Sequence, residues 1–421
     1  MNVKVLIGFL VVLAAGAGRV LGVSAVDNVA MAQRANSRMV DITYDLSGEA
    51  AIVTLGIETN GVALSDRAVT SLAGDVAKVV EPGANRHIIW NAGNDWPENL
   101  ATNARAKVTA WATNAPPLYM VIDLGTAAST CPVYYYGSAE AVPGGVTNDL
   151  YKTARLVLRR IPATGGAGFY MGSPTNETGR AAIREDLHVV NLTQDYYIGV
   201  YEVTQEQWYR VMGTNPALYQ GAGWATRPVE RVTYYHIREN INNTSLGTVW
   251  PEAANPGAGS FMGVLRSRTG GAFVFDLPTE AQWEYACRAG AAGAYNVGGA
   301  GLELLGRYTL NGGSTGQTVS AGSYLPNAWG LYDMYGNLWE WCRDWFSENP
   351  EWQTYYSSTE GAVDPKGVST AVAAAEGNKR CIRGGAWNSG ATDCRSATRL
   401  LALPNSNTPA SVGFRISASL P

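Results

Sequence analysis

The feature that most constrains this chain is a tryptophan-rich stretch late in the sequence, residues 326–345, which reads PNAWGLYDMYGNLWEWCRDW. Within it Trp339 and Trp341 alternate with a glutamate and a cysteine, and this period of two indicates a β strand with one aromatic face. Residues 335–337, Tyr-Gly-Asn, predict the turn that leads into the strand, because Gly and Asn both adopt positive φ. We therefore expect a turn and a packed strand around which the chain is organised.

The same stretch contains hard oxygen donors within a few residues of one another. Asp333 and Glu340 flank the turn, whose backbone carbonyls lie between them. Carboxylate and carbonyl oxygens are the ligands that calcium prefers. The alternative is a turn whose carboxylates accept hydrogen bonds from nearby backbone amides.

Composition bounds the class of protein. With 421 residues the chain is long enough for two or three domains. A net charge of -4 gives no electrostatic reason to expect nucleic acid or anionic lipid as a partner. Glycine (48), tyrosine (22) and tryptophan (13) are abundant, which favours short strands, turns and loops over helical bundles.

The beginning of the chain has the pattern of a secretory signal. Lys4 precedes an apolar run at residues 5–17, and the small residues at 23–25 suit a cleavage site. We expect a signal peptide at residues 1–25 and a secreted or periplasmic mature protein. The alternative is a membrane anchor, but the run is too short to span a bilayer comfortably, so we expect no stable membrane insertion. No cysteine follows the run, so a lipoprotein anchor is not expected.

The next part of the chain alternates apolar and polar residues in short segments. They are residues 39–46, 51–58, 87–90 and 106–111, separated by turn-forming residues. This spacing predicts a small all-β sandwich at residues 26–124, of the immunoglobulin or fibronectin type. Residues 125–150 are read as a loop-rich connector.

Five cysteines are present, at long and irregular spacings that match no zinc motif. In an oxidising compartment an odd number leaves at least one thiol unpaired. Cys131, in the connector, is the candidate for that thiol.

Two capping boxes predict helices in the second half of the chain. Thr204 and Thr279 are each followed three residues later by glutamine and then by a tryptophan that can be buried. Glu280 and Glu284 share one face of the second helix, and we expect that face to be solvated.

Several motifs appear in a fixed order over most of the chain. They are YMGS at 170–173, DYYIGVYEVT at 195–204, RPVE at 227–230, residues 277–290, residues 327–345, RGG at 383–385 and GFR at 413–415. Together they resemble the sulfatase-modifying factor family, whose founding members are formylglycine-generating enzymes. The resemblance runs from about Leu156 to the C-terminus and implies a domain at residues 151–421. It also implies an irregular α+β fold related to C-type lectins.

The formylglycine-generating enzymes oxidise a cysteine of a sulfatase to formylglycine, using copper that two active-site cysteines hold. Thiolates are suitable soft ligands for Cu(I). The family places this pair after a Gly-Gly-Ser stretch and before an Arg-x-Ala-x-Arg segment. Here Ala386 stands in place of the serine, and the interval between Gly385 and Arg395 is shorter than in the family. Cys394 is the one cysteine left in it, next to the arginine segment. We therefore expect neither copper nor formylglycine chemistry.

The resemblance also supplies a ligand set for calcium and a disulfide. The family's calcium residues in the tryptophan stretch correspond to Asp333, Gly336, Leu338 and Glu340, which implies structural calcium. A disulfide is expected among Cys287, Cys342, Cys381 and Cys394. The favoured pair is Cys342–Cys394, because the family folds the C-terminal segment against the aromatic stretches.

Three functions remain open. The first is a secreted, non-catalytic family member whose lectin-like loop surface, residues 387–409, binds a protein or carbohydrate through Trp387, Asn388, Asp393 and Arg395. This region is a possible site of sequence diversification, as in variable proteins of lectin-like fold. The second, the alternative, is a formylglycine-generating oxidoreductase acting on sulfatase cysteines, or another oxidative enzyme of the family. The third is a structural surface component with the sandwich as a spacer.

Overall fold

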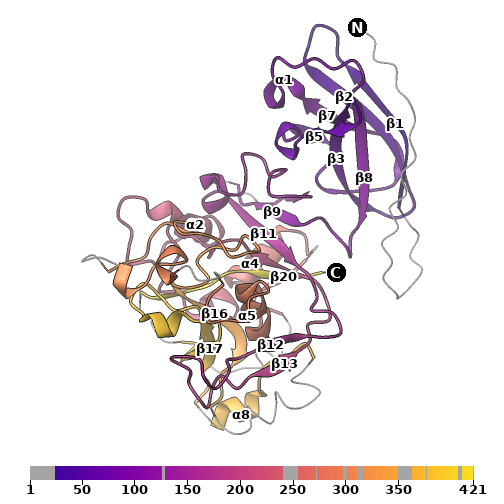
Figure 1. Ribbon diagram of the computed structural model, residues 1–421. Coiled ribbons are helices and arrows are strands. Elements are labelled where there is room, and N and C mark those ends of the chain that lie inside the picture. The colour runs from indigo at the N-terminus through magenta and orange to yellow at the C-terminus, as the bar shows by residue number, and fades with distance from the viewer. Residues whose placement is uncertain are drawn as a thin grey trace. The chain divides into compact units, whose positions relative to one another are not determined.

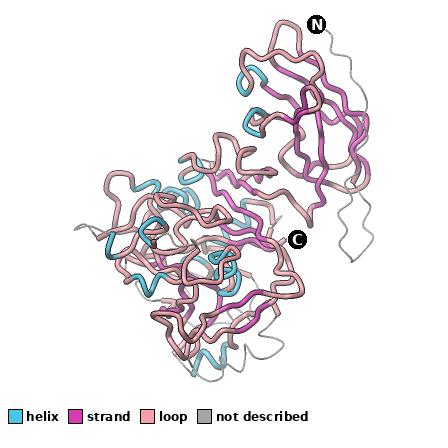
Figure 2. Tube along the Cα trace, viewed as in Figure 1, coloured by secondary structure: helices cyan, strands magenta, loops and turns pink. Residues whose placement is uncertain are grey.

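The structure is a computed structural model in which strands and loops predominate and helices are few and short (Figures 1 and 2). It describes residues 24–125, 129–239, 255–271, 273–296, 301–311, 316–348, 363–375, 377–405 and 410–420. The predicted signal peptide lies outside them except for its last two residues. By its internal contacts the chain divides into two units, Met1–Val121 with Val133–Asn148, and Ile122–Pro132 with Asp149–Leu420.

The first unit consists of two antiparallel sheets. One has the strand order β1-β2-β7-β5, and the other has the order β4-β3-β6 with β8 also paired to β3. The bounds are β1 Ala25–Gln33, β2 Met39–Ser47, β3 Ala51–Thr59, β4 Val62–Ala63, β5 Leu72–Gly74, β6 Val79–Val80, β7 Gly83–Asn91 and β8 Arg105–Ala112, with η1 Asp66–Ala68 and α1 Ala92–Asp95. Strands therefore occur at all four segments that alternate in the sequence.

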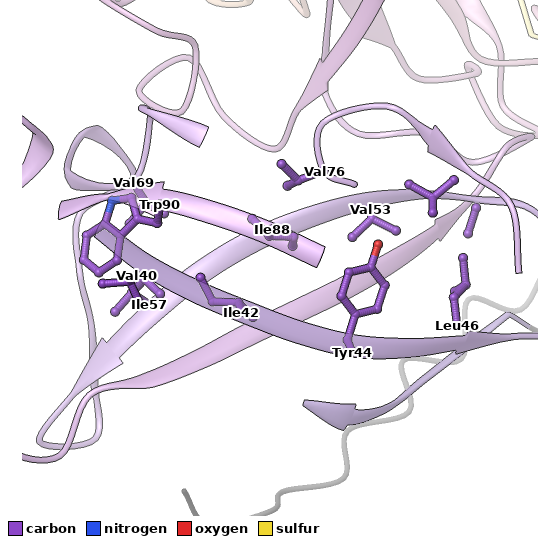
Figure 3. Packing of buried hydrophobic residues seen from close by; sticks show 12 residues of the cluster. Val40, Ile42, Tyr44, Leu46, Val53, Ile57, Val69, Val76, Ile88 and Trp90 are labelled. Carbon is purple, nitrogen blue, oxygen red and sulfur yellow. The ribbon is translucent and has the colours of Figure 1, made fainter. Parts of the chain in front are cut away.

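Both sheets contribute to one hydrophobic core (Figure 3). Along β2 every second residue is buried, so that Ile42 and Tyr44 point inward between half-exposed neighbours. They pack in one cluster with Val53 of β3 and Trp90 of β7. The Tyr44 hydroxyl donates to the carbonyl oxygen of Asp75 at 2.7 Å, so the buried phenol is satisfied.

Two strands lie near the division between the units, β9 (Tyr119–Asp123) and β10 (Val133–Tyr136). The segment predicted as a connector, 125–150, therefore contains a strand. Cys131 lies in the second unit, where it is buried and its backbone amide donates to the carbonyl oxygen of Arg268 at 2.7 Å.

The second unit contains three groups of strands. In the first, β11, β14, β20 and β15 are consecutive antiparallel neighbours, so the C-terminal strand β20 lies between two strands from earlier in the chain. The second is the pair β12–β13, and the third is a sheet of order β18-β17-β16-β19. The bounds are β11 Arg155–Ile161, β12 Phe169–Met171, β13 His188–Val190, β14 Tyr196–Gly199, β15 Val274–Asp276, β16 Trp339–Trp345, β17 Arg380–Arg383, β18 Arg399–Ala402, β19 Val412–Gly413 and β20 Ser417–Ser419.

Short helices pack against these sheets. The α-helices are α2 Gln205–Met212, α3 Tyr234–Ile237, α4 Phe261–Arg268, α5 Glu280–Arg288 and α8 Thr370–Ala375; the 3-10 helices are η2 Asp149–Lys152, η3 Trp224–Thr226, η4 Leu302–Leu304, η5 Thr309–Asn311 and η7 Ala391–Cys394. Both predicted capping boxes are confirmed, at Thr204 for α2 and Thr279 for α5. No helix in the described part of the chain is long and apolar enough to cross a membrane.

The tryptophan-rich stretch forms the predicted turn and strand. Gly336 has φ +144° and Asn337 has φ +66°, as expected for the turn. The strand with the predicted aromatic face is buried on both sides, because all seven residues of β16 are buried. Trp341 donates its indole N–H to Val232, and Glu340, which points the opposite way, is buried against α5.

Candidate functional site

A groove of about 360 Å³ lies in the second unit beside η7 and the start of β18. It is lined by Gly179, Ala181, Arg184, Glu185, Trp339, Asn388, Ser389, Asp393, Arg395, Thr398, Arg399, Leu400 and Ser411. Three of the four residues predicted for ligand binding, Asn388, Asp393 and Arg395, are thus brought together. The prediction that residues 387–409 form one surface is tested only in part, since 406–409 lie outside the described residues.

Arg395 corrects the prediction of an exposed ligand-binding arginine, because its exposed fraction is only 2%. Its guanidinium forms two 2.8 Å hydrogen bonds to the carboxylate of Glu185 and one of 2.6 Å to Glu177. The carbonyl oxygens of Gly179 and Thr392 accept its remaining hydrogen bonds. Burial alone would raise the pKa of Glu185, but Arg395 holds it below the usual value. This arginine therefore stabilises the wall of the groove.

Trp387 is also placed differently from the prediction. It is half-buried and is not among the residues that line the groove. Its indole N–H donates to the carbonyl oxygen of Ala410 at 2.8 Å, and its ring packs edge-to-face on Tyr219 with centroids 5.8 Å apart. Asn388 and Asp393 are exposed, as predicted.

The other two arginines of the groove are ion-paired as well. Arg399 binds both carboxylate oxygens of Glu280, at 2.5 and 2.7 Å, and Arg184 pairs with Glu348. Glu280 has no exposed surface, so the predicted solvated face of α5 is wrong. Burial alone would raise the pKa of Glu280, but Arg399 and Arg383 lower it to about 2.

Glu284, on the same face of α5, is also buried and also has arginine partners. It pairs with Arg383 of β17 and accepts a 2.8 Å hydrogen bond from Arg288. Arg383 lies on strand β17 and Arg288 lies one turn further along α5. The apolar pattern of the helix alone therefore did not reveal these partners. Such buried charge networks fix the arrangement of the elements that they join.

A second cluster of carboxylates lies at the turn before β16. Asp333 and Glu340 both belong to it, as predicted, and the structure adds Glu202. Glu202 accepts from the side-chain amide of Asn337 at 2.7 Å and from the backbone amide of Leu338 at 3.0 Å. Burial, followed by the charges of Asp333 and Glu340, raises its pKa well above the usual value. The signal for it in the sequence is a glutamate inside the otherwise uncharged run at residues 196–203.

The carboxylate oxygens of this cluster differ in how well they are satisfied. Both oxygens of Glu340 accept from Arg415, at 2.5 and 2.6 Å, and one also accepts from the Trp283 indole at 2.7 Å. Asp333 Oδ2 accepts from the Gly322 amide at 2.6 Å, whereas its Oδ1 is buried without a hydrogen-bond partner in the described structure. Burial raises the pKa of Asp333 to about 6.

These contacts bear on both interpretations of the turn. Asp333 and Glu202 accept from backbone amides, as the capping interpretation requires. The unsatisfied Oδ1 of Asp333 suits a cation, but within the described residues no three His, Cys, Asp or Glu side chains are arranged to hold a metal ion. A calcium site here therefore depends on the backbone carbonyls of Gly336 and Leu338.

All five cysteines are buried free thiols in the structure. The predicted Cys342–Cys394 bond is not present. Cys394 packs its sulfur where a side chain on Gly385 would otherwise be, and Gly385 has φ +77°. Burial, with the neighbouring Asp393, raises the pKa of the Cys394 thiol to about 12. The one cysteine of the interval that carries the family's copper ligands is therefore enclosed and protonated at neutral pH.

Comparison with known proteins agrees with the ordered motifs. The model of the sulfatase-modifying factor enzyme 1-like domain matches residues 154–420, more than half of the chain. This protein is a member of the sulfatase-modifying factor family. The resemblance inferred from the sequence is confirmed.

Curated relatives share only part of their length with this family member. A chaperone protein LppX of Paenibacillus barcinonensis is 36% identical over 187 residues, which cover 37% of this chain and 65% of that protein. A formylglycine-generating enzyme of Streptomyces coelicolor is 38% identical over 155 residues, covering 33% and 45%. The chain thus spans less than two thirds of either relative.

Two solved structures are similar over nearly their whole length. Treponema denticola variable protein 1 aligns with a TM-score of 0.46 at 26% identity, covering 64% of this chain and 96% of that one. PvdO from Pseudomonas aeruginosa aligns with a TM-score of 0.47 at 24% identity, covering 63% and 94%.

Proposed function

We propose that this family member is a non-catalytic protein that binds a protein or carbohydrate ligand in the groove beside η7. The observation that carries the proposal is the position of Cys394. None of the described residues that line the groove is a cysteine, and Cys394 is enclosed beneath Gly385. The family's copper site needs two thiolates in this interval, so the residues present do not fit it.

The charges around the groove favour a neutral or cationic ligand. Arg395 and Arg399 are paired with buried carboxylates, which an anionic ligand would have to displace, and Arg184 is paired with the partly exposed Glu348. Separating a buried ion pair in this way is strongly unfavourable. The exposed amide of Asn388 and carboxylate of Asp393 instead offer hydrogen bonds to hydroxyl, amide or ammonium groups.

The proposal is tested with immobilised full-length protein and two sets of probes, neutral oligosaccharides and neutral or basic synthetic peptides. We expect at least one probe to bind the wild type. The double variant Asn388→Ala/Asp393→Asn removes the exposed amide of Asn388 and the charge of Asp393, and the loss of one hydrogen bond and one charged contact corresponds to about tenfold weaker binding.

The matched control is Glu98→Gln/Asn99→Ala, which makes the same kinds of change at exposed positions of the first unit. It should bind as the wild type does. Equal binding by both double variants would place the ligand elsewhere and contradict the proposal.

A second candidate function is a formylglycine-generating oxidoreductase or another oxidative enzyme. The observation in its favour is the 38% identity to the Streptomyces coelicolor enzyme. It requires a ligand set other than a cysteine pair in the interval before Arg395. Conversion of the cysteine of a sulfatase-motif peptide to the aldehyde by the purified protein separates the two functions.

We also propose that calcium binds at the turn before β16, with Asp333, Glu340 and the carbonyls of Gly336 and Leu338 as ligands. The buried, unsatisfied Oδ1 of Asp333 supports this assignment. A ligand that binds only the native state at a hundredfold excess over its Kd adds about 2.7 kcal/mol to the free energy of unfolding. A chelator should therefore lower the melting temperature.

The variant that tests this is Asp333→Ala, which removes the side-chain oxygen ligand and should abolish the response to chelator; Asn would keep an amide oxygen that can bind calcium. Glu340→Ala is less informative, because it also leaves Arg415 and Trp283 without their acceptor. An unchanged melting curve with and without chelator in the wild type would leave only the capping role of the turn.

We further propose that the protein is exported and that its two units have the folds expected from the sequence. The expected signal at residues 1–25 would deliver the protein outside the cytoplasm, where N-terminal sequencing should find it beginning near Val26. The two-sheet core of the first unit supports an immunoglobulin- or fibronectin-like module, and family membership supports a C-type-lectin-like second unit.

A further inference from the structure

Two of the buried cysteines lie on neighbouring strands. Cys342 is in β16 and Cys381 is in β17, and these strands are antiparallel. Their register pairs Trp341 with Ile382, and Cys342 and Cys381 are the next residues along the two strands, at the point where the register shifts. A bulge in β16 begins here and ends where Trp345 pairs with Arg380.

Both cysteines point to the same side of the sheet. Glu340, two residues before Cys342, contacts α5, and so does Arg383, two residues after Cys381. Side chains two residues apart share one face of a strand, so both thiols face α5. Figure 1 shows α5 beside β16 and β17, and residues of the helix contact both strands.

The surroundings of the two thiols overlap. Cys381 Sγ lies 3.2 Å from Glu280 Oε2, and burial followed by the charge of Glu280 raises its pKa. Cys342 has its pKa raised by burial, then by Glu280, Asp344 and Cys381. Glu280 is thus a common neighbour of the pair.

We propose that Cys342 and Cys381 form a disulfide in the oxidised protein, in place of the Cys342–Cys394 bond expected from the sequence. Opposite residues of an antiparallel pair have Cβ atoms about 4.5–5.5 Å apart, and a disulfide needs about 3.5–4.5 Å. Because the register shifts after Trp341, the two cysteines are not held at the spacing of a regular cross-strand pair. Glu280 loses the thiol of Cys381 as a donor but keeps Arg383 and Arg399.

The oxidant is a small-molecule disulfide such as glutathione disulfide. The thiolate of one cysteine attacks it, releasing one glutathione and forming a mixed disulfide, which the second cysteine then attacks to release the other. The protein loses two protons and two electrons, and the oxidant is reduced to two thiols. In the folded protein both thiols are enclosed and protonated, so the bond forms during folding, before β16 is buried.

The test is disulfide mapping of the full-length protein after refolding from the reduced, denatured state in a glutathione redox couple. Free thiols are alkylated in denaturant before digestion. Each of the five cysteines lies in a separate tryptic peptide, so every pairing is distinguishable. We expect residues 308–343 linked to residues 381–383, and separated again by reductant.

Recovery of both peptides with alkylated cysteines would overturn the proposal, as would either one linked to another cysteine, including Cys394. Because the wild-type map decides the question, it does not depend on a variant that fails to fold. In addition, the oxidised wild type should melt at a higher temperature than the reduced protein. Cys342→Ser and Cys381→Ser should each abolish this shift, and Cys394→Ser should keep it.

Discussion

At the scale of the residue, Arg395 shows how the groove is held in place. Its charge is neutralised by Glu185, which is buried with it, and by the half-buried Glu177. Replacing it by alanine leaves these carboxylates without a counter-charge, and breaking a buried pair in this way typically costs about 3–5 kcal/mol. Arg395→Ala should therefore lower the urea midpoint strongly.

Asn388→Ala is the control, because this side chain is exposed in the same groove. Surface substitutions usually change the free energy of unfolding by less than about 0.5 kcal/mol. If both variants unfolded at the wild-type urea midpoint, Arg395 would not have the stabilising role assigned to it.

Two buried carboxyl groups make the metal-free protein sensitive to pH. Burial raises the pKa of Asp333 to about 6 and that of Asp344 to about 7, from 3.8. The folded state thus binds these protons more tightly than the unfolded state does, and stability falls as pH rises from about 4 to 7. In chelator, Asp333 and Asp344 should therefore add to the free energy of unfolding when the pH is lowered from 7.5 to 5, against the opposite effect of His188 and His236, whose pKa values are lowered by burial.

Asp333→Asn cannot titrate, so it should show a smaller increase over the same pH range. With calcium present the wild-type protein should also respond less, because a bound cation keeps Asp333 ionised. Equal changes for the wild type and Asp333→Asn in chelator would contradict the raised pKa of Asp333.

At the scale of the element, α5 depends on its capping box. The Thr279 hydroxyl accepts from the Gln282 amide at 3.2 Å, and the Gln282 side chain accepts from the Thr279 amide at 2.9 Å. Thr279→Ala should cost about 1 kcal/mol in urea unfolding, within the usual range for such caps. Thr279→Ser keeps the acceptor and should stay near wild type; equal losses in both would point to packing instead.

The elements that the sequence predicted well are those specified by local chemistry. The cap at Thr279 and the positive φ values of Gly336 and Asn337 depend on residues a few positions apart. The burial of Arg395 and Glu280 was not predictable in this way. Their partners are 210 and 119 positions distant, and only the folded chain brings them together.

At the scale of the whole molecule, the family's motifs predicted the second unit but not the chemistry of its groove. The place of Asn388 and Asp393 in the loop region after the RGG motif was enough to predict that both are exposed. The same reasoning failed for Trp387 and for the Cys342–Cys394 bond, because it did not show which side chains turn inward. A cysteine beneath Gly385 is one such side chain.

The central claim is that this family member does not generate formylglycine. The most direct measurement incubates the purified full-length protein with a sulfatase-motif peptide in air, with and without Cu(I), and follows the peptide by mass spectrometry. The formylglycine-generating enzyme of Streptomyces coelicolor serves as the positive control. We predict that the peptide cysteine remains unchanged; its copper-dependent conversion to the aldehyde would contradict the account.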